Sequence, residues 1–139
     1  MGGINGIALA KDERYILSVG QEKRVNYWGI DSTDAVHTQS IDPSHPDTST
    51  DEGRVVVVSS DGKYVLTGGT GGVVRLWDYA SSTLLSEAAG HSGGITSISL
   101  SPDDKQVVSV GEDGSIFYWH LLTNIEGAVT GAVEQKESP

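Results

Sequence analysis

The chain has 139 residues, of which 37% are hydrophobic and 20% are charged, and this balance predicts one globular domain rather than a disordered chain. Its net charge of −10 argues against nucleic acid and anionic membrane surfaces as ligands, because both carry negative charge, and is compatible with a basic protein surface. The sequence contains no cysteine, which excludes disulfides, thiolate metal sites and a cysteine nucleophile, and which fits a cytoplasmic protein.

The first predicted unit is a group of short strands joined by tight turns. Its predicted strands cover residues 4–10, 15–19, 24–28 and 35–41, with turns at 11–14 and 20–23. These strands are rich in β-branched and aromatic side chains, whereas the turns are polar. Strands that follow one another through tight turns form a meander, so the unit predicts an antiparallel sheet.

A polar stretch separates this unit from the second one. Residues 42–53 contain two prolines and many small polar side chains, a composition that predicts a loop. The second unit then repeats the pattern of the first, with strands predicted at 54–59, 64–67, 73–77 and 83–88 and turns at 60–63 and 68–72.

The third unit shows the same pattern most clearly. Its strands are predicted at 95–100, 107–110 and 116–119, with turns at 101–104 and 111–114. The first turn contains proline and two aspartates, which fix φ and cap backbone amides. Residues 121–133 are able to supply a fourth strand, and residues 134–139 are predicted to be a polar tail.

Each unit carries a tryptophan at the end of its third strand. The three tryptophans of the chain are Trp28, Trp77 and Trp119, so their spacings are 49 and 42 residues. A period of this length indicates one supersecondary unit used repeatedly, which is typical of a binding scaffold.

The residues around these tryptophans resemble WD40 repeats. The third unit carries the residues of that pattern in order: Gly90-His91, Ser101-Pro102-Asp103, Ser109, Asp113 and Trp119. The resemblance implies an all-β fold of three consecutive four-stranded antiparallel blades of a β-propeller, covering residues 1–41, 54–89 and 90–133. Propellers close with four to eight blades, so three blades imply an incomplete ring with exposed apolar flanks. We therefore expect missing blades or another chain to complete it.

The resemblance also implies a structural role for four residues of the third unit. His91, Ser109, Asp113 and Trp119 would form a buried hydrogen-bond tetrad. The other units retain only partial tetrads, Ser18 with Trp28 and Thr67 with Trp77. At the aspartate position they have Glu22 and Gly71, and the second unit has Ser49 at the histidine position. We expect those two blades to be held mainly by apolar packing.

The motifs that suggest catalysis have a structural explanation. Ser109, His91 and Asp113 are the residue types of a hydrolase triad, but the repeat accounts for all three positions. The glycines of 68–72 suggest a phosphate loop, but a strand rather than a helix is predicted after them. We therefore expect no catalytic residue, no cofactor and no metal, and we expect that the protein is not an enzyme.

By the resemblance, partners bind at the hairpin turns and strand entries on one face of the propeller. This candidate partner-binding face comprises Gln21, Asp51, Glu52, Thr70, Ser92 and Glu112. None of them is Trp, Tyr or Arg, the residue types that usually anchor interfaces. This absence favours a partner that docks on the edges and sides of the propeller.

The sequence therefore predicts a non-catalytic scaffold for protein–protein interaction. Residues 90–119 also resemble the terminal blades of WD40 proteins of cilia and flagella, which would imply axonemal or tubulin-associated partners. One alternative is the substrate-receptor propeller of a ubiquitin ligase, although the arginines it would need, Arg24, Arg54 and Arg75, lie within strands. Another is a sugar- or small-ligand-binding propeller, although the aromatic residues occupy predicted blade-core positions.

Overall fold

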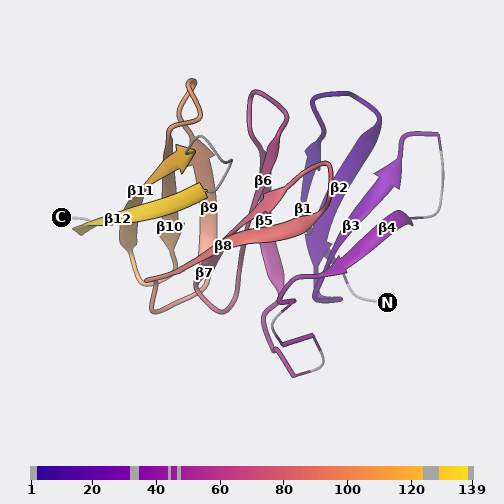
Figure 1. The fold of residues 1–139 in the computed structure, drawn as a ribbon. Coiled ribbons are helices and arrows are strands. Elements are labelled where there is room, and N and C mark those ends of the chain that lie inside the picture. Colours follow the sequence, from indigo (N-terminus) through magenta and orange to yellow (C-terminus); the bar gives the residue numbers. More distant parts are fainter. Residues whose placement is uncertain (1–2, 32–34, 44, 47, 124–128, 138–139) are drawn as a thin grey trace.

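The computed structural model describes residues 3–31, 35–43, 45, 46, 48–123 and 129–137. Over these residues the chain forms three antiparallel sheets of four strands, and each sheet keeps its strands in sequence order. We refer to the sheets as blades 1, 2 and 3, and Figure 1 shows them side by side in that order. The prediction of three consecutive four-stranded antiparallel blades is therefore confirmed.

The strand boundaries follow the predicted pattern closely. Blade 1 consists of β1 (Ile4–Leu9), β2 (Tyr15–Gly20), β3 (Arg24–Gly29) and β4 (Ala35–Ser40). Blade 2 consists of β5 (Gly53–Val58), β6 (Tyr64–Gly69), β7 (Val73–Asp78) and β8 (Thr83–Ala89). Blade 3 consists of β9 (Ile95–Leu100), β10 (Gln106–Gly111), β11 (Ser115–Thr123) and β12 (Val129–Glu137).

The largest difference from the predicted strands lies at the end of blade 3. The third strand was expected at 116–119 and the tail from 134, but β11 continues to Thr123 and β12 to Glu137. The two strands pair along their whole length, from Ser115 opposite Glu137 to Thr123 opposite Val129. Main-chain pairing needs no apolar side chain, so the polar end of β12 carries no strand signal. Residues 124–128 and 138–139 of the predicted blade and tail lie outside the described residues.

Equivalent turns adopt equivalent backbone conformations in all three blades. The residue two positions before the second strand of each blade has a positive φ. These residues are Glu13 (60°), Gly62 (76°) and Asp104 (60°). The turn before the third strand behaves likewise at Lys23, Gly72 and Gly114. Only glycine takes this conformation without strain, so the repeat preserves the backbone shape more strictly than the side chain.

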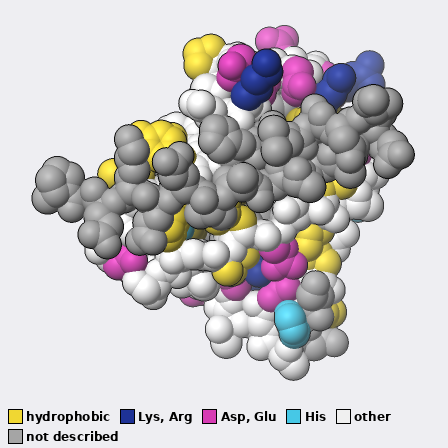
Figure 2. All heavy atoms as spheres, turned by 60° about the vertical axis from the view of Figure 1, so that its left-hand side comes forward, with side chains coloured by type: hydrophobic (Ala, Val, Ile, Leu, Met, Phe, Trp, Pro, Cys, Tyr) yellow, Lys and Arg dark blue, Asp and Glu magenta, His cyan; other side chains and the backbone are white. Residues whose placement is uncertain are grey.

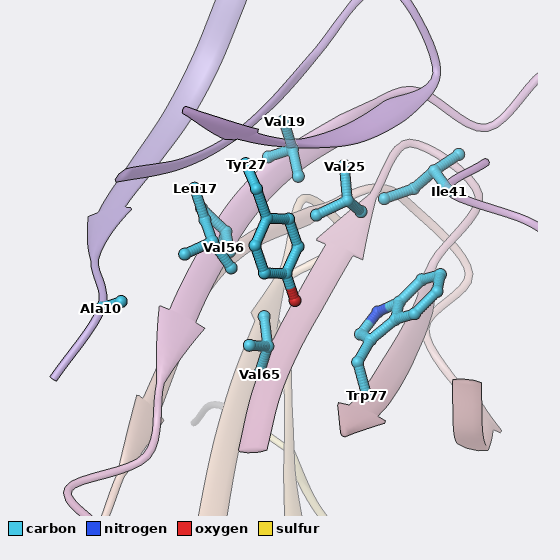
Figure 3. Close-up of a cluster of buried hydrophobic side chains, with 9 residues drawn as sticks. All are labelled: Ala10, Leu17, Val19, Val25, Tyr27, Ile41, Val56, Val65 and Trp77. Atoms are coloured by element: carbon cyan, nitrogen blue, oxygen red, sulfur yellow. The ribbon is translucent and has the colours of Figure 1, made fainter. Parts of the chain in front are cut away.

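Two apolar clusters hold neighbouring blades together. The first joins blades 1 and 2, and Figure 3 shows Trp77 of blade 2 and Tyr27 of blade 1 within it. The second joins blades 2 and 3 and contains Trp119. Trp77 and Trp119 therefore face the preceding blade. The innermost strands also meet, because β5 contacts both β1 and β9.

Blade 1 presents an apolar flank that has no blade against it. Ile7 and Ile16 are 67% and 37% exposed, whereas the residues at the same repeat positions in blade 3, Ile98 and Val107, are 5% and 0% exposed. Leu9 extends this flank at 53% exposure. The three described blades thus lie side by side without closing a ring (Figure 1), as the incomplete-ring prediction expected.

Polar turns connect the blades at the end that carries the β1–β2, β5–β6 and β9–β10 turns. Asp104 accepts hydrogen bonds from the backbone amides of Ser60 (2.9 Å) and Asp61 (3.1 Å), which ties blade 3 to blade 2. Figure 2 shows acidic and basic side chains together at this upper end. Within the described ranges, no helix is long and apolar enough to cross a membrane.

Candidate functional site

Blade 3 contains a directed chain of hydrogen bonds around His91. The indole Nε1 of Trp119 donates to Ser109 Oγ at 2.9 Å, and Ser109 Oγ lies 2.7 Å from His91 Nε2. All three residues are buried. Because the Ser109 hydroxyl accepts from the indole, it is free to donate its own proton to an unprotonated Nε2.

The other side of the imidazole reaches Asp113 through a serine that the sequence analysis did not single out. His91 Nδ1 lies 2.8 Å from Ser115 Oγ, which donates to Asp113 Oδ1 at 2.6 Å. The direct separation between His91 Nδ1 and Asp113 Oδ1 is 4.0 Å. The predicted four-residue arrangement thus becomes a chain of five, in which a neutral His91 protonated on Nδ1 satisfies every donor and acceptor.

Electrostatics support this neutral form of His91. Burial lowers the pKa of His91, and the charge of Asp113 opposes that shift only in part. The Asp113 carboxylate is exposed, and hydrogen bonds from Ser115 and Ser92 hold its pKa far below the usual value. The hydrogen-bond chain therefore ends at an ionised Asp113, while the imidazole of His91 within it is uncharged.

Blade 2 contains an ionic cluster around Arg75 instead of a hydrogen-bond chain around a histidine. Arg75 is buried, and its Nη1 donates to Asp51 Oδ2 at 2.7 Å. Its Nη2 lies 3.4 Å from Asp42 Oδ2, and its Nε lies 3.4 Å from Glu87 Oε2. Asp51 also accepts from the backbone amide of Gly71 at 3.0 Å, which secures the turn that lacks an aspartate.

The loop between blades 1 and 2 is drawn into this cluster through Asp42. Burial disfavours ionisation of Asp42, but the charge of Arg75 and hydrogen bonds from Ser49 and His45 outweigh it, so its pKa is lowered. Among the described residues, Asp42 Oδ1 is a buried oxygen without a hydrogen-bond partner. Arg75 therefore neutralises carboxylates from the loop as well as from its own blade.

The cluster adds to one prediction and corrects another. Blade 2 contributes to both apolar clusters, and the buried Arg75 also ties it to the loop through Asp42 and Asp51. Asp51 does not belong to an accessible partner-binding face, because it is only 6% exposed and its carboxylate binds Arg75 and Gly71. The repeat hides this arrangement, since Arg75 stands where the third unit has Phe117.

The partial tetrads form the hydrogen bonds that their residue types allow. Trp28 Nε1 donates to Ser18 Oγ at 2.8 Å, and Trp77 Nε1 donates to Thr67 Oγ1 at 3.0 Å. Beside the first pair lies a hollow of about 80 Å³ that Glu22 and Asn26 also line. Blade 1 therefore has the indole–hydroxyl pair without the side chains that cover it in blades 2 and 3.

The arrangement around Ser109 does not suit catalysis. Ser109 is 0% exposed, and its hydroxyl is shared between Trp119 and His91. A nucleophile must reach its substrate, which this oxygen cannot do without opening the blade. In the described part of the chain, no group of three or more His, Asp or Glu side chains is placed to hold a metal ion.

Several residues of the predicted partner-binding face meet in one open hollow. Gln21, Glu52 and Thr70 line a hollow of about 470 Å³, together with Arg54. Glu112 forms an ion pair with Arg54, one of the lining residues. Ser92 lies apart from this group, and its hydroxyl donates to Asp113.

Aromatic side chains gather in a second cavity that the sequence analysis missed. Tyr15, Tyr27, His37 and Tyr79 line a cavity of about 260 Å³ between blades 1 and 2. The aromatic residues were expected in blade-core positions, but these four also form the wall of a pocket. Tyr27 and Tyr79 come from different repeat positions, so no periodic signal marks the pocket.

Comparison with known proteins places these features in a family. The family model described as "WD domain, G-beta repeat" matches residues 49–78 and 82–120. A solved structure described as the crystal structure of RRP9 WD40 repeats superimposes with a TM-score of 0.80 and 20% sequence identity, covering 99% of this chain and 39% of that one. This likeness shows the fold.

Two proteins named cilia- and flagella-associated protein 52 are similar in sequence. The one from Chlamydomonas reinhardtii is 34% identical over 108 residues, which is 78% of this chain and 17% of that protein. The one from Homo sapiens is 29% identical over 108 residues, 78% of this chain and 16% of that protein. The chain thus spans about a sixth of the length of these relatives.

Proposed function

Because this chain belongs to the WD40-repeat family, we propose that it serves as a non-catalytic scaffold for protein–protein interaction. The buried position of Ser109 and His91 supports this role, since both side chains bind each other and their neighbours within blade 3. A rigid array of sheets with polar turns offers partners a large and stable surface.

We propose further that the assembly which this scaffold serves is ciliary or flagellar, within the cytoplasmic compartment. The observation that carries this proposal is the similarity to cilia- and flagella-associated protein 52 over 78% of the chain. The partners would be axonemal or tubulin-associated proteins. The net charge of −10 favours a basic surface on such a partner.

The partner is proposed to dock on the edges and sides of the blades. The hollow with Gln21, Glu52 and Thr70 lacks an aromatic anchor, and its one arginine, Arg54, is paired with Glu112. Buried aromatic and arginine anchors supply most of the affinity in protein interfaces, so this hollow alone is a poor primary site.

Co-sedimentation with demembranated axonemes tests the proposed assembly. The purified chain should pellet with axonemes in a saturable manner, and more strongly than with microtubules made from tubulin alone. Variants Gln21→Ala and Thr70→Ala should bind as the unaltered chain does, because the proposed contact lies on the side. A chain that stays in the supernatant at every axoneme concentration would contradict the proposal.

The apolar flank of blade 1 is proposed to be covered by a further blade, from a longer chain or another subunit. The matched residues Ile98 and Val107 are covered by blade 2 in this way. Size-exclusion chromatography with light scattering should therefore detect self-association of the 14.6 kDa chain, and Ile7→Lys with Leu9→Lys should abolish it. A stable monomer that melts cooperatively would contradict this proposal.

A further inference from the structure

The cavity between blades 1 and 2, which we call the tyrosine pocket, has the size of a single large side chain. Its volume is about 260 Å³, and Tyr15, Tyr27, His37, Tyr79, Ser81 and Ser82 line it. β2, β3 and β4 of blade 1 and the turn after β7 of blade 2 contribute these residues. Ligand pockets for complete small molecules are usually larger, so the dimensions favour an anchor side chain of a protein partner.

The rings of the tyrosine pocket surround Tyr27 in different orientations. Tyr79 stacks on Tyr27 with centroids 5.7 Å apart and an interplanar angle of 24°. Tyr15 and His37 approach Tyr27 edge-on, with centroid distances of 6.3 and 5.5 Å. Ring faces carry negative partial charge, so a pocket lined by three tyrosines suits a cation better than an anion.

Carboxylates strengthen the negative character of the tyrosine pocket. The Tyr79 hydroxyl donates to Asp12 Oδ2 at 3.0 Å, which places one charge at the outer end of a pocket ring. Asp78 accepts hydrogen bonds from the amide (2.9 Å) and the hydroxyl (2.6 Å) of Ser81, a second wall residue. Burial is the main cause that raises the pKa of Tyr79, and Asp12 raises it further. Burial also raises the pKa of Tyr27, where a hydrogen bond with Ser82 acts in the opposite direction and the charge of Asp78 adds to the rise.

Basic groups are scarce around the tyrosine pocket. The described side chains that line it include no lysine or arginine. The adjoining hollow shares Tyr15 and contains one cation, Arg14, beside Glu13 and Asp31. The pocket thus combines aromatic faces with an excess of negative charge, and this is the environment that attracts a cation.

We propose that the tyrosine pocket receives a basic side chain, best an arginine, from the protein that docks on the side of blades 1 and 2. An arginine guanidinium is planar, stacks on aromatic rings and donates several hydrogen bonds at once, which suits the tyrosine rings and the serine hydroxyls. The inference rests on the proposed scaffold function, and it adds the chemistry and the place of one contact.

The direct test is a titration with N-acetyl-arginine methylamide, followed through the tyrosine ring signals in NMR spectra of the full 139-residue chain. The signals of Tyr15, Tyr27 and Tyr79 should shift in a saturable manner, whereas Tyr64 and Tyr118, the other two tyrosines, should not shift. The neutral citrulline analogue has nearly the same shape and should bind at least ten times more weakly. Equal binding of citrulline, or of a leucine analogue, would overturn the assignment of a cation.

Variants locate the site. Tyr15→Leu removes one ring, and Asp12→Asn removes a charge but keeps every ring, so each should weaken arginine binding about five-fold or more. Gln21→Ala, in the other hollow, should leave it unchanged. If circular dichroism shows that Tyr15→Leu disturbs the fold, the test of arginine binding depends on Asp12→Asn alone. Unchanged arginine binding in Asp12→Asn would overturn the proposal.

This experiment separates the pocket from the scaffold function. Failure of arginine to bind, together with continued sedimentation with axonemes, would refute the tyrosine pocket alone. Failure of sedimentation, with arginine still bound at Tyr15, Tyr27 and Tyr79, would refute the ciliary assembly and leave the pocket standing.

Discussion

Where blade 3 packs the neutral imidazole of His91 against Phe117, blade 2 packs the guanidinium of Arg75 against Asp51. Phe117 and Arg75 occupy the same position in their repeats, 42 residues apart. Both blades keep the indole–hydroxyl pair next to this position, through Trp119 with Ser109 and Trp77 with Thr67. All three blades keep the pair, and blades 2 and 3 differ in the chemistry of the residues beside it.

The two arrangements differ in the consequence of losing one of their residues. The chain around His91 is neutral at its centre, so loss of one member leaves an unpaired polar group. The cluster around Arg75 encloses opposite charges in a buried site, and removal of one partner leaves a charge without compensation. Blade 2 is thus expected to be the more sensitive blade, although its tryptophan is paired as in blade 3.

Arg75→Met should cause the largest loss of stability. The substitution keeps most of the side-chain volume but leaves the buried carboxylates of Asp42 and Asp51 without a cation, so the free energy of unfolding should fall by about 3–5 kcal/mol. Urea unfolding measures the loss. Arg24→Met, at an exposed arginine of blade 1, should change it by less than about 0.5 kcal/mol. Equal effects of the two variants would contradict a special role of the buried ionic cluster in blade 2.

Removal of the hydroxyl next to each indole should give a graded series. Ser109→Ala leaves both Trp119 and His91 without their partner and should cost about 2–4 kcal/mol, whereas Thr67→Val orphans Trp77 alone and should cost about 1–2 kcal/mol. Ser18→Ala should cost less than about 1 kcal/mol, because Trp28 is only half-buried. Thermal unfolding ranks the three variants, and a reversed order would contradict the argument that the loss grows with the number and burial of the groups left unpaired.

Acidification should weaken blade 3 first. The pKa of His91 lies below its unfolded value of about 6.5, so the unfolded chain binds the proton first and stability is lost as the pH falls below that value. Asp42, with its lowered pKa, contributes stability that is lost only at more acidic pH, below its ordinary carboxyl value. Denaturation curves between pH 7.5 and 5.5 should slope downward, and less so in His91→Gln. An unchanged slope in that variant would contradict the neutral imidazole.

The strands were predictable because their signals are local. Alternating β-branched side chains and turns such as Ser101-Pro102-Asp103 act within a few residues, and the pairing of Trp119 with Ser109 repeats in phase along the chain. The end of β12 was missed because backbone pairing with β11 holds its polar residues.

The rest of the site depends on contacts that no repeat encodes. Ser115 joins His91 to Asp113, yet the other units have Arg24 and Val73 at that position. Arg75 contacts carboxylates from a loop and from its own blade. These carboxylates lie far from Arg75 in the sequence, and no shared motif links them to it. The tyrosine pocket combines residues of two blades, so only the folded arrangement brings its rings together.

Exchange of the three indole protons with deuterium, followed by NMR, tests the account most directly. Each blade has one tryptophan, so each blade reports separately. Trp28 should exchange fastest, because its hydroxyl pair lies beside an open hollow, and Trp77 and Trp119 should be strongly protected. Arg75→Met should accelerate Trp77 most, and His91→Ala should accelerate Trp119 most. Equal exchange at the three indoles, or an equal response of Trp77 and Trp119 to both variants, would contradict the central conclusion. That conclusion is that the Arg75 cluster protects the indole of blade 2 and the His91 chain protects the indole of blade 3.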